Sequence, residues 1–193
     1  MARYIGPKLK KRQRFGLATE GESIRRKNPR TPRQSDYAQR LIQKQKLKFI
    51  YGVMEKQMKR YAREAFEGAG ETPIELLRRL ETRLDNVVYR LGLGKTREHS
   101  RQLVSHGHIL VDEKKLDIPS YRVMPGQTIN VQAKLLRKPR FSEQVELNRK
   151  EISVLGFLEY KKDGGRLLSV PSETDLPKDI DMAKVLEFYR RVI

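Results

Sequence analysis

Residues Arg83 to Val131 read RLDNVVYRLGLGKTREHSRQLVSHGHILVDEKKLDIPSYRVMPGQTINV, and this stretch decides the fold. Its pattern predicts an apolar-striped helix, then a basic helix capped by Thr96 and ended by Gly107. Strands are predicted at 109–111 and 128–131. Lys and Arg side chains fall along one edge of this compact scaffold, which is typical of a surface that contacts a polyanion.

Further helices are predicted before this stretch. Ser35 is an N-cap, and Gly52 ends the helix that Ser35 starts. Another helix spans about 54–66. The tetrapeptide Thr72-Pro73-Ile74-Glu75 has the pattern of a capping box with proline in the first turn, so it predicts the start of a third helix.

The C-terminal part is predicted to hold two more helices and a hairpin. Ser142 opens a helix that ends near Leu155. Two short apolar runs flank Asp163-Gly164-Gly165, which predicts a β-hairpin. The last helix spans about 181–191 and carries an apolar stripe.

Positive charge is concentrated toward the N-terminus. The 193 residues carry a formal net charge of +18, and residues 1–63 hold 19 Lys or Arg against 4 Asp or Glu. Self-repulsion on this scale destabilises a compact protein unless a polyanion neutralises it. A merely solubilising surface normally intersperses both signs. The imbalance therefore predicts a nucleic-acid-binding protein.

The sequence excludes several kinds of site. It contains no Cys, hence no disulfide, thiolate zinc site or cysteine nucleophile. No nucleophile elbow, Gly-rich phosphate loop or paired-carboxylate motif occurs, so we expect no enzyme, no metal and no cofactor. No apolar run approaches the ~18 residues of a membrane span and no secretory signal is evident, so we expect a cytoplasmic protein.

The basic helix after Thr96 holds the candidate phosphate contacts. Arg97 and Arg101 lie one turn apart, and their guanidinium groups can reach successive phosphates. Taken alone, two such arginines more often mark an ordinary solvated face. We expect charge reversal at both positions to weaken RNA binding without unfolding the protein.

His106 and His108 raise a metal hypothesis, because a spacing of two places them on one face of a strand. A third ligand would have to come from His99 or Asp112. Histidines at a helix end that face RNA are the better interpretation.

Residues 1–34 are expected to form an extended basic arm that folds on RNA. They contain scattered Gly and Pro and almost no apolar periodicity. Prolines hold the basic run 25–33 extended, so that its charges can follow a strand backbone. Tyr4, Phe15 and Tyr37 are candidates for stacking on bases, although Tyr37 fits the helix core equally well. The alternative for the arm is a disordered solubilising tail.

Four sequence blocks resemble the family of bacterial small-subunit ribosomal protein four. They are MARYIGPKLKKRQRFG, PRQSDYAQRLIQKQKLKFIYGV, LETRLDNVVYRLG, and RQLVSHGHILV with the following SYRV and Pro-Gly. The resemblance covers nearly the whole chain. It implies an α+β fold with a basic arm (1–34), a helical domain (35–80, completed by 178–193) and an inserted mixed α/β RNA-binding domain (81–177) whose core module is 82–135.

The same resemblance implies a structural protein of the small ribosomal subunit. Such a protein binds 16S ribosomal RNA early and nucleates assembly of the subunit body. It contacts small-subunit protein five, which links the family to decoding accuracy, and lies beside messenger RNA at the entry channel, here mapped onto Arg30 and Arg33. Some members repress their own operon. A monomer within the ribosome, without membrane contact, is expected.

The predicted RNA-binding residues are basic side chains of the arm and first helix, and polar residues around the basic helix of the core module. They are Arg3, Lys8, Lys10, Lys11, Arg12, Arg14, Arg25, Arg26, Lys27, Arg30, Arg33, Arg40, Lys44, Lys48, Arg83, Lys95, Arg97, Arg101, Gln102, Ser105, His106 and His108.

Three departures from the family pattern matter. Leu9 and Arg12 stand where many members carry the first pair of zinc-binding cysteines, so we expect no zinc. The arm is shortened before Arg30. The turn after the first strand is Asp112-Glu113 in place of the common Asn-Gly, and we expect a different turn because this pair accepts positive φ poorly.

Two rival functions use the same small RNA-binding module. An enzyme such as a pseudouridine synthase or a tyrosyl-tRNA synthetase needs a catalytic domain, and the roughly 60 residues after Val131 are too few for one. The alternative is a free-standing RNA-binding chaperone that recycles ribosomes. Such a chaperone is not expected to match the arm and the first helix as well.

Overall fold

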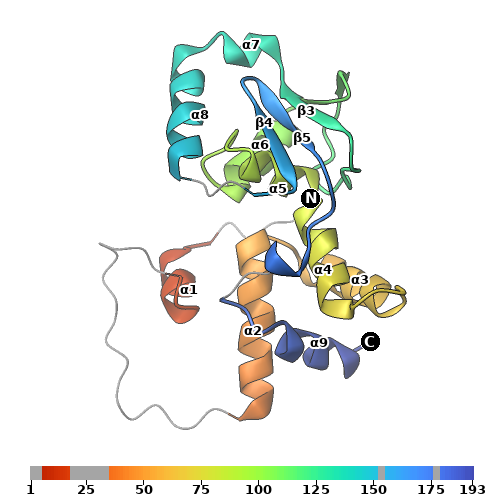
Figure 1. Cartoon of the computed structure of the whole chain (residues 1–193). Helices are drawn as coiled ribbons and strands as arrows, with labels where there is room; N and C mark the ends of the chain where they lie inside the picture. The colour runs from red at the N-terminus through yellow and green to blue at the C-terminus, as the bar shows by residue number, and fades with distance from the viewer. Residues whose placement is uncertain (1–5, 18–34, 152–154, 176–178) are drawn as a thin grey trace. The chain divides into compact units, whose positions relative to one another are not determined.

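The computed structural model describes residues 6–17, 35–151, 155–175 and 179–193. The chain forms two compact units (Figure 1), of which unit 1 comprises 1–67 with 177–193 and unit 2 comprises 68–176. The predicted α+β fold is confirmed. The domain limits expected from the sequence stay a prediction, and the division between compact units falls before the third predicted helix rather than after it.

Unit 1 is helical in its described residues. It contains α1 (Leu9–Arg14), α2 (Asp36–Tyr51), α3 (Glu55–Phe66) and α9 (Met182–Arg190), and α9 packs against α2 (Figure 1). Both predicted ends of α2 are confirmed. The Ser35 hydroxyl accepts a hydrogen bond from the Ala38 N–H at 3.3 Å, and Gly52 ends the helix with φ of 60°.

Helix α1 corrects the expectation of a wholly extended arm. Phe15, directly after it, is only 7% exposed, and its ring centroid lies 5.6 Å from that of Phe49 in α2. Burying such a side chain contributes about 1.5–3 kcal/mol, which favours a folded segment despite its weak periodicity. Phe15 therefore packs inside unit 1 instead of stacking on a base. Tyr37 is exposed, and Tyr4 lies outside the described residues.

Unit 2 combines helices with a five-stranded antiparallel sheet. Its helices are α4 (Thr72–Glu81), α5 (Leu84–Arg90), α6 (Arg97–Ser105), α7 (Ala133–Leu136) and α8 (Pro139–Glu151), with a 3-10 turn at Glu173–Asp175. The strands β1 (Ile109–Val111), β2 (Lys114–Lys115), β3 (Thr128–Val131), β4 (Leu158–Lys161) and β5 (Gly164–Leu167) lie in the order β2-β1-β3-β5-β4. None of the helices that the structure describes is long and apolar enough to cross a membrane.

Several predicted element ends are wrong. The capping box does not form, since Glu71 takes the N-cap position of α4 and no side chain caps that helix. Helix α8 begins at Pro139 rather than Ser142, because proline fits the first turn of a helix. The hairpin of β4 and β5 is confirmed, but Gly164 and Gly165 pair within β5 instead of forming the turn.

The core of unit 2 lies between one face of the sheet and the helices α5 and α6. Buried sheet residues on this face include Ile109, Val111, Ile129, Val131 and Leu167. Gly165 of β5 lies opposite Ile129 on the same face, under Leu91 at the end of α5. A Cβ atom at Gly165 would overlap Leu91 Cδ2 and the Glu159 carbonyl oxygen. Helix packing, not turn geometry, requires this glycine.

Arg149 fixes α8 to the rest of unit 2. Its guanidinium group donates to the carbonyl oxygens of Leu91 at 3.2 Å, Lys161 at 2.7 Å and Gly164 at 3.0 Å. Burial lowers the pKa of Arg149, which nevertheless stays a cation at neutral pH. One side chain thus joins the end of α5, the β4–β5 hairpin and α8.

Our expectation that the β1–β2 turn would avoid the backbone conformation of an Asn-Gly turn is wrong. Asp112 and Glu113 both adopt positive φ, at 47° and 66°, as an Asn-Gly pair would. The Asp112 carboxylate accepts hydrogen bonds from the Thr128 N–H at 2.9 Å and the Gln127 amide at 2.8 Å. These bonds lower the pKa of Asp112, and the bond from the Thr128 backbone contributes most. They offset the cost of the left-handed backbone.

We expect Gly165→Ala to lower the free energy of unfolding by about 1–3 kcal/mol, since the added methyl group must displace Leu91 or the backbone. Urea denaturation followed by circular dichroism measures the change. Gly156→Ala is the matched control, because nothing lies within 4 Å of its Cβ position. Equal stability of the two variants would contradict the packing role of Gly165.

We expect Glu113→Gly to raise the free energy of unfolding by roughly 0.5–1 kcal/mol. The left-handed backbone costs a non-glycine residue about 1–2 kcal/mol, and the extra chain entropy of glycine offsets about half of that. Glu113→Ala keeps the backbone cost and should give no such gain. Thermal denaturation of both variants distinguishes relief of backbone strain from simple loss of the exposed carboxylate.

Candidate nucleic-acid interface

Helix α6 is fixed at both ends by local interactions. The Thr96 hydroxyl accepts a hydrogen bond from the His99 N–H at 3.2 Å, and Gly107 follows the helix with φ of 69°. Both predicted ends are confirmed. One face of α6 buries Leu103 and Val104 in the core, and the opposite face presents polar side chains.

Asp85 is a buried carboxylate that holds two arginines. It is 3% exposed and accepts hydrogen bonds from Arg83 Nε at 3.0 Å and Arg83 Nη2 at 2.7 Å. Arg101 of α6 donates its Nε to the same carboxylate at 2.8 Å. Burying a charge in this way requires close pairing, which the two guanidinium groups supply. Asp85 therefore joins α5 to α6.

A second buried carboxylate, Glu81, organises the adjoining side chains. It is 1% exposed, and Arg90 donates its Nε and Nη2 to the two carboxylate oxygens at 3.0 and 2.7 Å. Asn86 donates to Glu81 at 2.6 Å and accepts from Arg97 Nε at 2.8 Å. The Arg97 guanidinium group also lies 4.5 Å above the ring of Tyr89. The network thus joins three arginines to two carboxylates, and a fourth, Arg97, to the Asn86 amide.

This network changes the meaning of three predicted RNA contacts. Arg83 is 4% exposed and serves as an internal ion-pair partner, so its side chain is not available to a phosphate in this conformation. Arg97 and Arg101 are half-buried. Charge reversal at Arg101 would place a new carboxylate against Asp85, so our expectation that this change leaves the fold intact is wrong. Contact of Arg97 and Arg101 with RNA stays a prediction.

The basic residues predicted on α2 are also paired within their unit. Arg40 contacts Glu187 at 2.7 Å. Lys44 donates a hydrogen bond to the Glu55 carboxylate at 3.1 Å, and Lys48 donates a shorter one to the same carboxylate. Burial alone raises the pKa of Glu55, but the hydrogen bonds from Lys48 and Lys44 outweigh it and lower that pKa. The regular spacing of these cations reflects an internal ion-pair cluster, and their contact with RNA stays a prediction.

The predicted basic residues of the arm fall into two groups. Lys8, Lys10 and Arg14 are exposed, and Lys11 and Arg12 are half-buried. The remaining ones lie outside the described residues, namely Arg3, Arg25, Arg26, Lys27, Arg30 and Arg33.

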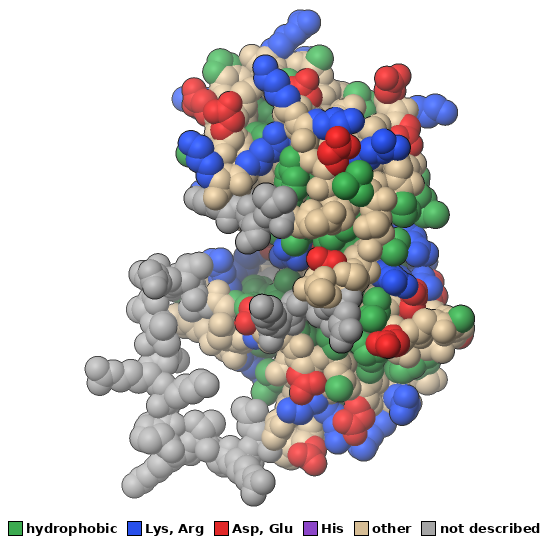
Figure 2. Space-filling model, in the orientation of Figure 1, with side chains coloured by type: hydrophobic (Ala, Val, Ile, Leu, Met, Phe, Trp, Pro, Cys, Tyr) green, Lys and Arg blue, Asp and Glu red, His purple; other side chains and the backbone are tan. Residues whose placement is uncertain are grey.

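The polar face of α6 and the residues that flank it remain accessible. Gln102, Ser105 and His106 are exposed, as is Lys95 before the helix, and His108 is half-buried. These five predicted residues therefore lie where a large ligand can reach them. The face of the molecule drawn in Figure 2 intersperses acidic and basic side chains, so the positive surplus does not form a uniform coat there.

Three lysines near His108 were missed by the sequence analysis. Burial lowers the pKa of His108, and the positive charges of His106, Lys138, Lys115 and Lys134 lower it further. Lys115, Lys134 and Lys138 are exposed, and we call these three lysines the cationic cluster. Lys134 lies in α7 and Lys138 follows it, about 30 residues beyond α6. Local sequence patterns therefore gave no signal that these lysines lie near His108.

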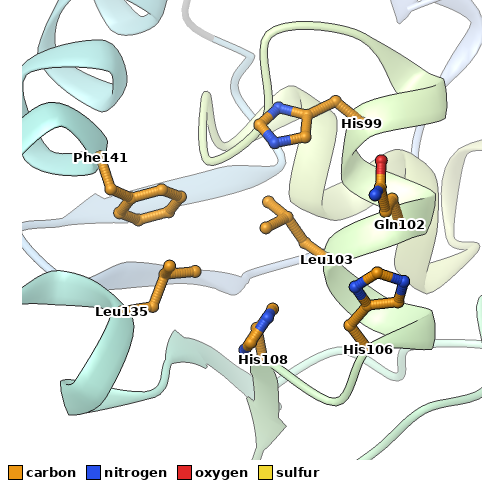
Figure 3. Close-up of a pocket in the computed structure, with 7 residues that line it drawn as sticks. All are labelled: His99, Gln102, Leu103, His106, His108, Leu135 and Phe141. Atoms are coloured by element: carbon orange, nitrogen blue, oxygen red, sulfur yellow. The ribbon is translucent and has the colours of Figure 1, made fainter. Parts of the chain in front are cut away.

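A hollow of about 210 Å³ lies beside His106 and His108 (Figure 3). Its lining comes from α6, the residue before β1, α7 and α8, and comprises His99, Gln102, Leu103, His106, His108, Leu135 and Phe141. Within the described ranges, no group of three or more His, Cys, Asp or Glu side chains is placed to hold a metal ion.

Known proteins that resemble this chain match it over almost its whole length. The model of the ribosomal protein S4/S9 N-terminal domain matches residues 3–81, and that of the S4 domain matches residues 82–129. The small ribosomal subunit protein uS4 of Persephonella marina is 44% identical over 204 residues, covering 98% of this chain and 99% of the relative. The uS4 proteins of a Geobacillus species and of Lactococcus lactis are 41% and 38% identical, over 99% and 100% of this chain and 100% of each relative.

The chain belongs to the bacterial uS4 family. The family resemblance drawn from the four sequence blocks is thereby confirmed. The matched S4 domain begins at Thr82 and contains α5, α6, β1, β2 and the start of β3, hence Asp85 with its two arginines and the face of α6. Lys134 and Lys138 lie beyond the matched segment, and they extend the cationic surface of this uS4 chain.

We expect Asp85→Asn to lower the free energy of unfolding by about 3–5 kcal/mol, because the buried Arg83 loses its counter-charge. Asp117→Asn, at an exposed aspartate, is the control and should change stability by less than about 0.5 kcal/mol. Urea denaturation of the two variants tests this. Similar stability of both would show that the buried pairs do not hold α5 to α6.

Proposed function

We propose that this chain is a structural component of the small ribosomal subunit that binds 16S rRNA directly and early, and so nucleates assembly of the subunit body. Membership of the uS4 family supports the ribosomal role. The formal net charge of +18 supports a polyanionic partner. The chain acts by binding and not by catalysis, as is the case for a structural ribosomal protein.

The cationic cluster beside α6 carries this proposal. Lys115, Lys134 and Lys138 are exposed on a scaffold whose arginines are already fixed by buried carboxylates. Phosphate binding by such lysines releases counterions, which makes affinity fall steeply with salt. Because helical RNA offers side chains little base information in its deep groove, shape and 2′-hydroxyl groups are expected to select the site.

Two further roles extend the proposal. The basic arm would lie at the messenger RNA entry channel, through Arg30 and Arg33, and the chain would contact small-subunit protein five and thereby influence decoding accuracy. The family resemblance supports both roles. Crosslinking of the intact subunit, with messenger RNA bound, tests them separately.

The second candidate is a free-standing RNA-binding chaperone. It shares the S4 domain, but the match of residues 3–81 to a ribosomal N-terminal domain favours the structural role. Sucrose-gradient sedimentation distinguishes the two. Stoichiometric presence in small subunits supports the structural role, and association with stalled large subunits alone would support the chaperone.

We expect the double variant Lys134→Ala/Lys138→Ala to bind naked 16S rRNA more weakly, with a slope of log K against log salt that is shallower by about 1–2. Filter binding over a potassium chloride series measures both quantities. The fold should persist, because both side chains are exposed.

Lys161→Ala/Lys162→Ala is the matched control. It also removes two exposed lysines of unit 2, at the β4–β5 hairpin, and so makes the same change in net charge. Equal losses in the two double variants would mean that net charge, and not the cationic cluster, determines binding.

A further inference from the structure

The hollow beside α6 has apolar walls on one side. Phe141 of α8 and Leu135 of α7 face it from one direction, and Leu103 faces it from α6 (Figure 3). Leu103 and Leu135 are buried, and Phe141 packs against the core of unit 2, so these walls are held in place. At about 210 Å³ the hollow can take one heterocyclic ring system, but not a base pair.

Hydrogen-bonding groups line the other side of the hollow. The exposed amide of Gln102 supplies both a donor and an acceptor, and in the part of the chain that the structure describes this side chain has no hydrogen-bond partner. His99 Nδ1 accepts a hydrogen bond from the Lys95 N–H at 3.4 Å, and Nε2 is the second polar atom of this ring. The ring of His108 adds a further donor and acceptor at the lower edge (Figure 3).

The charges around the hollow are positive. The positive charges of Lys115 in β2, Lys134 in α7 and Lys138 after α7 all interact with His108. An uncharged heterocycle that enters this hollow would thus bring its attached phosphates close to ammonium groups. An apolar small molecule would gain nothing from these lysines, and an acidic peptide would place its charge against Phe141 and Leu135.

We propose that this hollow is a nucleobase site, which takes a single unstacked base from the bound RNA, with the base against Phe141 and its polar edge toward Gln102 and the histidines. Protein recognition of RNA commonly uses bases that leave the helical stack and lie on aromatic side chains. The inference rests on the proposed RNA-binding function and adds to it a contact with one base. The cationic cluster then holds the phosphates on either side of that base.

Phe141→Leu tests the site, because leucine keeps the apolar character but removes the aromatic face. Full-length protein is titrated onto 16S rRNA in filter-binding assays over a salt series. Affinity should fall roughly 5- to 100-fold, the range that stacking of one base supplies, and the salt slope should stay unchanged because no phosphate contact is lost. Leu147→Ala, at an exposed residue of the same helix, should bind like the wild type.

Phe141→Trp gives a direct optical readout, since the chain contains no other Trp. This variant should retain binding, and 16S rRNA should quench its indole emission by stacking. Leu147→Trp reports any quenching that arises from RNA proximity alone, and its emission should change little.

The outcomes separate this inference from the proposed function. If wild-type protein binds 16S rRNA but Phe141→Leu binds equally well, or if the indole emission of the Phe141→Trp variant does not respond to RNA, the nucleobase site is refuted and the ribosomal role stands. If the wild-type protein fails to bind 16S rRNA at all, the proposed function itself fails, and the nucleobase site falls with it.

Discussion

The arrangement of cations in unit 2 depends on two buried carboxylates, those of Glu81 and Asp85. Each receives a pair of hydrogen bonds from one guanidinium group. An unpaired carboxylate at these depths would be very costly, so the arginines are drawn inward and their side chains are fixed. As a result α5 and α6 are held together, and the polar face of α6 is preformed before any ligand arrives. A preformed surface loses less entropy on binding.

The positive residues of this chain therefore belong to two populations. One population neutralises internal acids, as Lys44 and Lys48 do at Glu55 in unit 1 and as Arg83 does at Asp85 in unit 2. The other, which includes Lys134 and Lys138, is exposed beside the hollow. Only the second population is organised to meet phosphates without loss of stability. A count of Lys and Arg along the sequence cannot separate the two, because burial and partners depend on the fold.

Much of the fold could be predicted where the determining interaction is local. The caps at Ser35 and Thr96 act within three residues of themselves, and the strands β1 and β3 follow apolar alternation. Prediction failed where distant residues decide. Gly165 is required by Leu91, and the β1–β2 turn is held by Thr128 and Gln127.

The candidate site followed the same rule. The family resemblance placed Gln102, Ser105 and His106 near one face, and all three are exposed, but nothing in the sequence indicated that Asp85 binds Arg83 and Arg101. Amine-reactive labelling, read by mass spectrometry with and without 16S rRNA, tests this division of the cations most directly. The structure predicts that Lys44 stays unreactive in both states, while Lys134 and Lys138 react in the free protein and become protected by RNA. Equal labelling of Lys134 and Lys138 in free and RNA-bound protein would contradict it.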